Sequence, residues 1–449
     1  MSRARPFVPA AASLLLAVFA LAMMTGPVRA GDIVEVTSPG GIVAWLKREP
    51  SIPIIALSAS WTGAGTASDP AGKEGRASLA SRMFDEGAGE LDSQAFQRRL
   101  EDLAVDLDLS AGRDELNLQL RTLTANADEA FRMAGMALSA PRFDAEPLER
   151  IRAGVLSAIA ADSRDPNAIA GDLFMARVFA GDAYGRPADG TAESVAGLTA
   201  ADLRAFAGER LARDNLLVGV VGDITPEALG PLLDTAFAGL PAKARIDEAV
   251  TAPVAEGPLV AVESFDSPQT VFVFGIRGIP RDDPDFNAAR VMNHILGGGG
   301  FTSMLTEEIR EQRGLTYGVY SYLRPLDRGG LWLGGMSTAN ARAGEAWQVL
   351  RDTMRRYLQD GPDEKRLAEA KANINGAFPL SLTSNRAIAG LLVTLQREKL
   401  GMDYVERRPD LINAVTMEDV RRVARRLLDP DRLLLVAVGK PEGLPAATQ

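Results

Sequence analysis

The chain is 449 residues long, contains no cysteine and a single histidine, and carries a formal net charge of −10 at pH 7. The lack of cysteine excludes disulfides and lipid attachment at a cysteine, and a chain of this length can form two domains whose cores need no covalent cross-links. An acidic chain has no electrostatic basis for binding phosphate backbones, so we expect no nucleic-acid partner.

The first 30 residues have the pattern of a secretory signal peptide. Arg3 and Arg5 precede an almost wholly apolar stretch at residues 10–24, and residues 28–30 place small side chains before a cleavage position. The apolar stretch is shorter than the ~20 residues that a membrane span needs. We therefore predict that residues 1–30 direct export to the periplasm and are removed, which leaves no membrane attachment. The alternative is that they are retained as an anchor.

Predicted strands and helices are interleaved through the first half. Residues 42–46 and 52–60 predict a strand pair, and the leucines at 116, 118 and 120 alternate with polar residues as in a half-buried strand. Residues 96–103 carry apolar side chains at helical spacing. Because hairpin-like connections are frequent, the pattern favours the α+β class, with a mostly antiparallel sheet and helices packed on one face.

The end of the first half recurs at the end of the chain. Residues 198–223 and 415–440 align without a gap, and each contains a Thr followed three residues later by Asp, an amphipathic helix, a polar turn and an apolar strand that ends at Gly. The Thr and Asp predict a capped helix N-terminus, with Asp in place of the usual Glu or Gln. A strand this apolar is expected to be buried on both faces.

A repeat of this length predicts two similar domains and not a solenoid. We assign residues 32–240 to an N-terminal domain, residues 241–256 to an exposed, proline-containing linker, and residues 257–449 to a C-terminal domain.

The second half begins with a strand-like run at residues 271–279 and a helix at about residues 286–296, which four glycines follow. Further on, Met304, Leu305 and Ile309 predict the apolar stripe of a helix that Gly314 ends in the left-handed conformation. Beyond this glycine, a strand is expected to place one set of alternating residues on a single face: Leu315, Tyr317, Val319 and Ser321.

The segment FTSMLTEEIREQRGLTYGVYSYL, residues 301–323, together with the preceding glycines, resembles the C-terminal-domain signature of the pitrilysin/insulinase-type peptidases. The match is best to their short, two-domain branch, which includes bacterial and mitochondrial-processing-peptidase-like proteins. The first half follows the same family through residues 40–75, so the resemblance covers nearly the whole chain after the signal peptide. It implies two homologous domains that enclose a peptide-binding cavity together with a partner chain.

Members of this family that cleave peptides carry the inverted zinc motif His-x-x-Glu-His on a helix of the N-terminal domain. By the resemblance, the matching positions here are Ser78, Ser81 and Arg82, and residues 155–159, where the family has its third ligand, contain no carboxylate. Independently of the family, one histidine and no cysteine cannot supply the usual donor sets of catalytic zinc. We therefore expect no metal in this chain.

The resemblance also implies two sets of substrate-contacting residues in the C-terminal domain. Arg310 and Tyr317 would face the zinc site across the cavity and stabilise the oxyanion that develops on the substrate carbonyl. The four-glycine run, residues 297–300, would form a flexible connection near the substrate cleft. The substrate-binding residues there would be Gly298, Gly299, Gly300 and Phe301. Without the resemblance, an alternative is a surface salt bridge from Arg310 to Glu307 or Asp282, with Tyr317 in the core. The lone histidine, His294, is expected to be a packed residue.

These observations predict a non-zinc-binding subunit of a heterodimeric periplasmic metallopeptidase. Its partner would be a homologous chain that supplies the zinc and its ligands, while this chain would bind extended peptides and supply Arg310 and Tyr317. The chain alone is expected to be inactive. The alternative function is that of a non-enzymatic peptide-binding or scaffold subunit.

Overall fold

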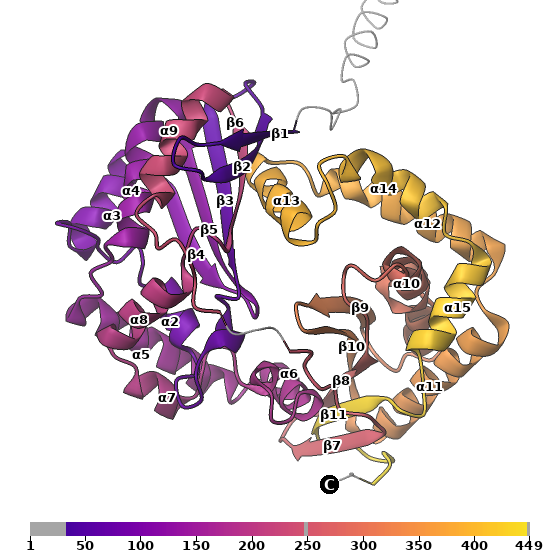
Figure 1. The fold of residues 1–449 in the computed structure, drawn as a ribbon. Coiled ribbons are helices and arrows are strands. Elements are labelled where there is room, and N and C mark those ends of the chain that lie inside the picture. Colours follow the sequence, from indigo (N-terminus) through magenta and orange to yellow (C-terminus); the bar gives the residue numbers. More distant parts are fainter. Residues whose placement is uncertain (1–32, 247–249, 447–449) are drawn as a thin grey trace, which may run out of the picture.

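The computed structural model describes residues 33–246 and 250–446. The predicted signal peptide lies outside these residues, as do residues 247–249 of the predicted linker. The described chain forms two mostly antiparallel sheets, each with helices on its outer side, on opposite sides of the molecule (Figure 1). This arrangement confirms the predicted α+β fold with two similar halves.

The first sheet has six strands in the order β1-β2-β6-β3-β5-β4. Strands β2 and β6 pair in parallel, and the other neighbours pair antiparallel. The strands are β1 (Ile33–Thr37), β2 (Val43–Arg48), β3 (Ile54–Thr62), β4 (Asp106–Ala111), β5 (Glu115–Leu123) and β6 (Leu216–Gly222).

The second sheet has five strands in the order β7-β11-β8-β10-β9, with β7 and β11 in parallel and the rest antiparallel. The last strand, β9, is therefore an edge strand that pairs only with β10 in the described part of the chain. The strands are β7 (Leu259–Ser264), β8 (Gln269–Arg277), β9 (Val319–Leu326), β10 (Gly329–Ala339) and β11 (Leu434–Gly439).

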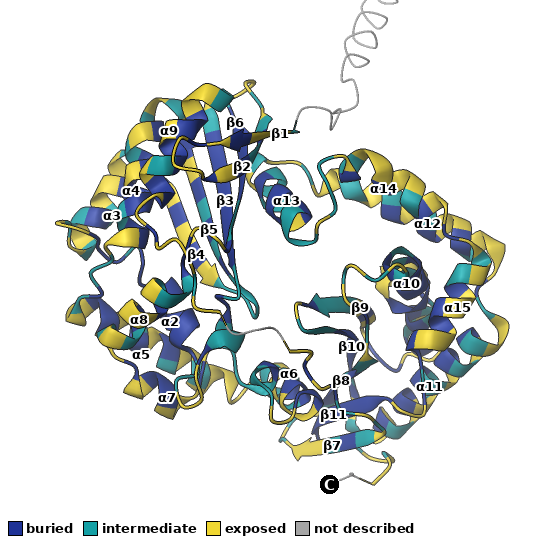
Figure 2. Ribbon diagram, viewed as in Figure 1, coloured by how far each residue is buried: buried dark blue, intermediate teal, exposed yellow. Residues whose placement is uncertain are grey.

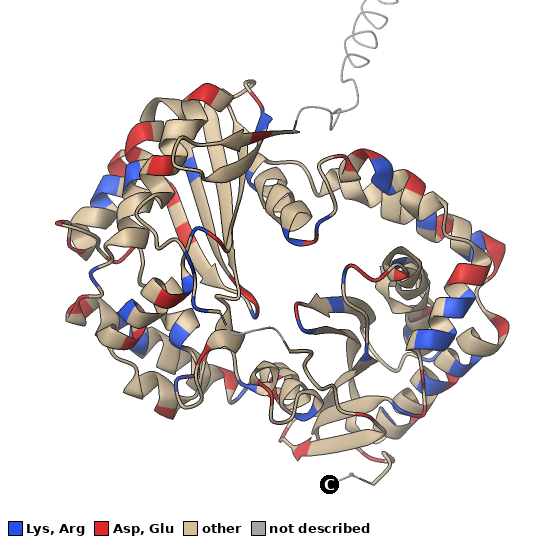
Figure 3. Ribbon diagram, viewed as in Figure 1, with Lys and Arg blue, Asp and Glu red and all other residues tan. Residues whose placement is uncertain are grey.

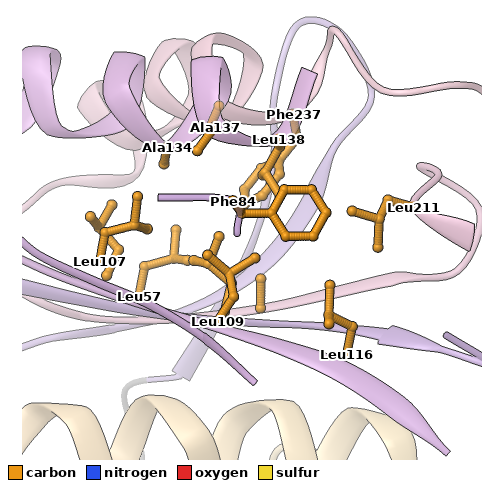
Figure 4. Packing of buried hydrophobic residues seen from close by; sticks show 14 of the residues in the cluster. Leu57, Phe84, Leu107, Leu109, Leu116, Ala134, Ala137, Leu138, Leu211 and Phe237 are labelled. Atoms are coloured by element: carbon orange, nitrogen blue, oxygen red, sulfur yellow. The ribbon is translucent and has the colours of Figure 1, made fainter. Parts of the chain in front are cut away.

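The outer side of the first sheet is covered by a layer of helices that makes the main core of this half. In Figure 4, Phe84 lies between the sheet residues Leu57, Leu109 and Leu116 and the helix residues Ala137 and Leu138. The helices of this half are α2 (Arg76–Ser81), α3 (Ser93–Asp102), α4 (Ala127–Ser139), α5 (Ala145–Asp162), α6 (Pro166–Val178), α7 (Ala192–Gly197), α8 (Ala200–Arg210) and α9 (Pro226–Phe237).

The second half repeats this construction with its own core around Phe272, Phe274 and Trp347. Its helices are α10 (Phe286–Asn293), α11 (Ala343–Asp360), α12 (Glu364–Leu380), α13 (Asn385–Arg397), α14 (Tyr404–Asn413) and α15 (Met417–Leu427). In both halves the exposed residues and the charges gather on the outer helices, whereas the strands are largely buried and uncharged (Figures 2 and 3).

The internal repeat corresponds to a helix followed by a central strand in each sheet. Helix α8 begins with a capping box between Thr199 and Asp202, and α15 begins with the same box between Thr416 and Asp419. In both strands that follow, β6 and β11, neighbouring side chains enter different cores on the two sides of the sheet. The predicted caps and the burial of these strands on both faces are confirmed.

The two halves exchange one helix each, which the sequence did not predict. Helix α13 of the second half packs on the inner face of the first sheet, and α6 of the first half packs on the inner face of the second sheet. Both contacts need a glycine: a Cβ on Gly219 in β6 would lie 2.5 Å from the carbonyl oxygen of Ala389, and one on Gly275 in β8 would lie 2.8 Å from the Phe174 ring. Each sheet thus has helices on both faces.

The predicted linker is irregular, but it is not exposed throughout. Ala252 and Val254 are buried in the cluster around α6, and the Ala252 amide donates to the carbonyl of Arg328 at 2.8 Å. The expectation of a wholly exposed linker is therefore wrong for its described C-terminal part, because its apolar side chains join the contact between the halves. Among the described residues, no helix has the length and apolar character needed to span a bilayer.

Candidate functional site

The positions that match the zinc motif lie on α2, where the structure brings two of them to one carboxylate. Ser78 donates a hydrogen bond to Asp189, and the Arg82 guanidinium lies 3.3 Å from the same carboxylate. Ser81 instead donates to the carbonyl of Ser78 at 2.8 Å. Ser78 and Arg82, four residues apart, lie on one helical face, as the two histidines of the motif would. Here this face carries a hydroxyl and a guanidinium, both of which contact Asp189.

The start of α2 is fixed by a buried carboxylate, Asp69, which accepts a hydrogen bond from the Ala77 amide at 3.1 Å. The Arg76 guanidinium lies 3.6 Å away and is itself buried. Burial raises the pKa of Asp69 to about 7, although Arg76 and the helix amides act in the opposite direction. These groups hold the helix in place but contribute no set of metal donors.

Helix α5 packs against α2 and carries residues 155–159, so the expected neighbourhood of the third ligand lies beside the motif helix. Its side chains there are Val155, Leu156, Ser157, Ala158 and Ile159. In the described part of the chain, no three His, Cys, Asp or Glu side chains come close enough to bind a metal ion together. With one histidine and no cysteine in the sequence, this chain cannot assemble the usual donor sets of catalytic zinc.

The glycine run in the second half begins inside one π-helical turn, η4 (His294–Gly298), and a second such turn, η6 (Thr306–Glu311), follows it. Such turns often occur at functional positions. A Cβ on Gly297 would lie 2.4 Å from Ser321 Oγ, and one on Gly298 would lie 2.5 Å from Asn293 Nδ2. The first two glycines are therefore required for close packing against β9 and α10, which differs from the flexible connection expected from the resemblance.

A buried hydrogen-bond network holds the start of this segment against the sheet. Asn293 Oδ1 accepts from Ser321 Oγ and from the Trp332 indole, each at 2.8 Å, and Asn293 Nδ2 donates to the Ser321 carbonyl at 3.1 Å. The neighbouring His294 is half-buried, and burial, with a contribution from Arg290, lowers its pKa. His294 is thus a neutral, packed side chain near pH 7.

Arg310 lies on η6 with its guanidinium 4.6 Å from the centre of the Phe301 ring, a cation–π contact. Its Nε lies 3.5 Å from Glu311, while Glu307 pairs with Arg366. Neither ion pair of the alternative interpretation, to Glu307 or to Asp282, forms in the described residues. Arg310 and Phe301, two of the predicted site residues, are therefore in direct contact at the surface.

Tyr317 is not on the strand where the sequence predicted it. Strand β9 begins only at Val319, and Tyr317 is 87% exposed while Leu315, Val319 and Ser321 are buried. Thr316 Oγ1 accepts from the Gly318 amide and donates to the Gly318 carbonyl, so a side-chain turn interrupts the extended chain. The predicted left-handed Gly314 is confirmed, with a φ of 58°, but the shared strand face is wrong for Tyr317.

Tyr317 instead belongs to an exposed aromatic surface that we define as Tyr317, Tyr320 and Tyr322. Tyr320 and Tyr322 stack with their ring centres 6.2 Å apart on edge strand β9, and Tyr317 and Tyr320 line the same 270 Å³ hollow beside β10. Tyr320 lies over Gly335, which leaves room for its ring. No hydrogen bond or ring contact joins Arg310 to Tyr317 in the described residues, so their convergence on one substrate atom stays a prediction.

Comparisons with known proteins agree with this architecture. The family described as the peptidase M16 inactive domain matches residues 197–374. An uncharacterised zinc protease of Mycobacterium leprae is 24% identical over 89% of this chain and 90% of its own length, and a non-peptidase homologue from Helicobacter pylori is 26% identical over 73% and 76%.

A crystal structure of a peptidase M16 inactive domain from Pseudomonas fluorescens is 28% identical, covers 93% of this chain and all of its own, and superposes with a TM-score of 0.84. The resemblance inferred from the sequence is thereby confirmed. The chain thus resembles M16 proteins over most of its length, and its residues 197–374 match the inactive domain of that family.

Proposed function

We propose that this chain is the non-zinc-binding subunit of a periplasmic heterodimeric metallopeptidase, in which a homologous partner supplies the zinc, its ligands and the general base. The observation that carries this proposal is a contrast between the two halves. At the C-terminus of α2, where the resemblance places a metal ligand, Arg82 pairs with Asp189 of a distant turn. The second half, by contrast, has exposed residues suited to peptide contact. A chain that has peptide-contacting residues but no metal ligands needs a partner to cleave peptides.

The aromatic surface supports binding of extended peptides. Strand β9 is an edge strand, and an extended peptide can add to such an edge through main-chain hydrogen bonds. Tyr320 and Tyr322 stand exposed on that strand, and Tyr317 precedes it. Aromatic side chains give a peptide large contact areas at low entropic cost.

Arg310 is proposed to act in the partner's active site. Its guanidinium is about one-third exposed and is held by the Phe301 ring and by Glu311, without a buried ion pair that would withdraw it. A cation at this position would hold the substrate carbonyl and stabilise the developing oxyanion, with the exposed Tyr317 hydroxyl as a second donor.

The test is peptide cleavage by the assembly of this chain with its zinc-bearing partner. Arg310→Ala should lower kcat by about 100- to 1,000-fold, the loss typical of one oxyanion donor, without dissociating the assembly. Arg342→Ala is the matched control, because Arg342 is also exposed and, within residues 33–246 and 250–446, forms an ion pair with Glu345 alone. Undiminished cleavage by the Arg310→Ala assembly would exclude the proposed role of Arg310.

The second candidate function is a non-enzymatic binding or scaffold subunit, which the name of the Helicobacter pylori relative favours. In that case Arg310→Ala and Tyr317→Phe would both leave the partner's cleavage rate unchanged, while substitutions in the aromatic surface would weaken peptide binding. The same cleavage assay therefore separates the two functions.

A further inference from the structure

A second cavity lies between the halves, away from the aromatic surface. Its volume is about 920 Å³, and its walls come from β1–β5 of the first sheet on one side and from α12, α13 and α14 of the second half on the other. This size suits a small organic ligand. Much of the lining is apolar and includes Ile54, Phe378, Leu391 and Leu392.

Arg408 of α14 lines this cavity and is only 1% exposed. Its guanidinium meets two neutral acceptors, Asn375 Oδ1 at 3.5 Å and the Ile374 carbonyl at 3.3 Å. It also interacts with the Tyr404 hydroxyl and lies 4.1 Å from the centre of the Phe378 ring. Its Nε has no hydrogen-bond partner, and no carboxylate pairs with it in the described residues. A buried cation without a counter-ion is costly, so its site favours an anion.

A second unsatisfied donor belongs to the same cavity. The Nδ2 of Asn385, at the first residue of α13, is shielded from solvent and has no hydrogen-bond partner. Few buried side-chain donors remain unsatisfied in native structures. In this chain two such donors, Arg408 Nε and Asn385 Nδ2, belong to residues that line the same cavity. Both are donors, so the group that would satisfy them is an acceptor.

The charges around the cavity are also positive, although the chain as a whole is acidic. Four cationic residues line it against two acidic ones: Lys47, Arg121, Arg386 and Arg408 against Glu49 and Asp106. Arg121 and Asp106 pair with each other, and Arg386 lies 4.0 Å from the Asp108 carboxylate, so these two cations are partly neutralised. Burial, together with the charges of Arg290 and Arg281, lowers the pKa of Arg408 to about 10, so the guanidinium remains charged near pH 7.

We propose that this cavity binds an amphipathic monoanion, a single-chain carboxylic acid whose carboxylate accepts hydrogen bonds from Arg408 and Asn385 while its alkyl chain lies against the apolar walls. Because both donor atoms are shielded from solvent, a small side-chain displacement accompanies binding. The site is separate from the surfaces that we assign to peptide binding, and its occupancy does not depend on peptide cleavage.

The test is calorimetric titration of the purified chain with dodecanoate below its micellar concentration. One saturable site is expected. Arg408→Met should weaken binding by about 10- to 100-fold, as loss of a charge-assisted hydrogen bond does, and Asn385→Ala should weaken it severalfold. Dodecanol, which has the same tail but no charge, should bind at least about tenfold more weakly for the same reason.

Two further variants keep the test decisive if Arg408→Met folds poorly. Leu391→Trp should fill the cavity and abolish binding, whereas Arg407→Met should bind like the wild type, because the adjacent Arg407 is exposed and pairs with Asp403. Vesicles of phosphatidylglycerol should not bind the chain if the ligand is a free acid. The proposal is overturned if the wild type has no saturable site, if Arg408→Met binds dodecanoate unchanged, or if only vesicles bind.

Discussion

At the scale of single residues, the structure shows which contacts hold α2, the helix that the resemblance matches to the zinc-motif helix. Arg82 places a permanent positive charge at the end of α2, and the Asp189 carboxylate forms an ion pair with it. Ser78 bonds to the same carboxylate. Because both partners of the Arg82 pair are about half exposed, the pair contributes little to stability, ~0–1 kcal/mol. The pair matters for chemistry, because Arg82 stands where the resemblance places a zinc ligand.

Asp69 gives a pH-dependent prediction at this scale. Its pKa in the folded chain is about 7, above the value of 3.8 for an unperturbed Asp. A raised pKa stabilises the folded state fully at pH values below about 4, and this contribution is lost as the pH rises through 7. The free energy of unfolding of the wild type should therefore fall between pH 5 and pH 8, at up to about 1.4 kcal/mol per pH unit.

Asp69→Asn should lack this component, because the amide cannot ionise. Urea unfolding at pH 5 and pH 8 measures the difference, with Asp102→Asn, a change at an exposed carboxylate, as the control. If wild type and Asp69→Asn lose stability in parallel over this range, the buried carboxylate is not the titrating group.

At the scale of elements, the repeated helix and strand are predictable because their signals are local. The Thr and Asp of each capping box lie three residues apart, and the apolar run of each following strand is continuous. Tyr317 was misplaced for an equally local reason. The alternation of residues 315–321 fits a strand, but the hydroxyl of Thr316 and the glycine at 318 form a turn that outweighs the alternation. The π-helical turns left no sequence pattern that we recognised.

The exchanged helices could not be predicted from one sequence. A helix that packs on the other half's sheet has the same apolar face as one that packs on its own. Gly219 and Gly275 permit the close contacts, but a glycine in a strand has several possible causes. The cavity that Arg408 and Asn385 line could not be predicted either, because it forms only where helices α13 and α14 meet the first sheet.

The exchange makes a prediction about stability. Phe174 on α6 and Leu392 on α13 are each about 1% exposed and belong to the clusters beneath the exchanged helices. Phe174→Ala should lower the free energy of unfolding by about 3–5 kcal/mol and Leu392→Ala by about 2–5 kcal/mol, through lost burial and the cavity left behind. Leu380→Ala is the control, because Leu380 is 74% exposed and should change stability by less than about 0.5 kcal/mol.

Chemical denaturation of the three variants provides the comparison. Losses below about 1 kcal/mol at both buried positions would mean that the exchanged helices are not firmly packed on the opposite sheets. Such a result would also weaken the proposal of a ligand site, because α13 forms one wall of the cavity.

At the scale of the whole molecule, the two halves share one construction but differ in what they retain. The first half keeps the motif helix without metal donors, and the second half exposes aromatic residues beside an edge strand. The sequence alone revealed the duplication, the fold class and the loss of zinc ligands, because these depend on local patterns and on residue counts. The contacts that join the halves depend on long-range packing. Among them are the ion pair between Arg328 and Asp182 at 2.5 Å and that between Arg397 and Glu115 at 3.0 Å.

We propose that this chain holds no catalytic zinc and that any peptide cleavage depends on a partner. Metal analysis of the purified chain, combined with a peptide-cleavage assay on the same sample, is the decisive experiment. We expect no stoichiometric zinc after dialysis and no product from the chain alone, with cleavage only after a zinc-bearing homologue is added. One tightly bound zinc ion per chain, together with cleavage by the isolated chain, would refute the proposal.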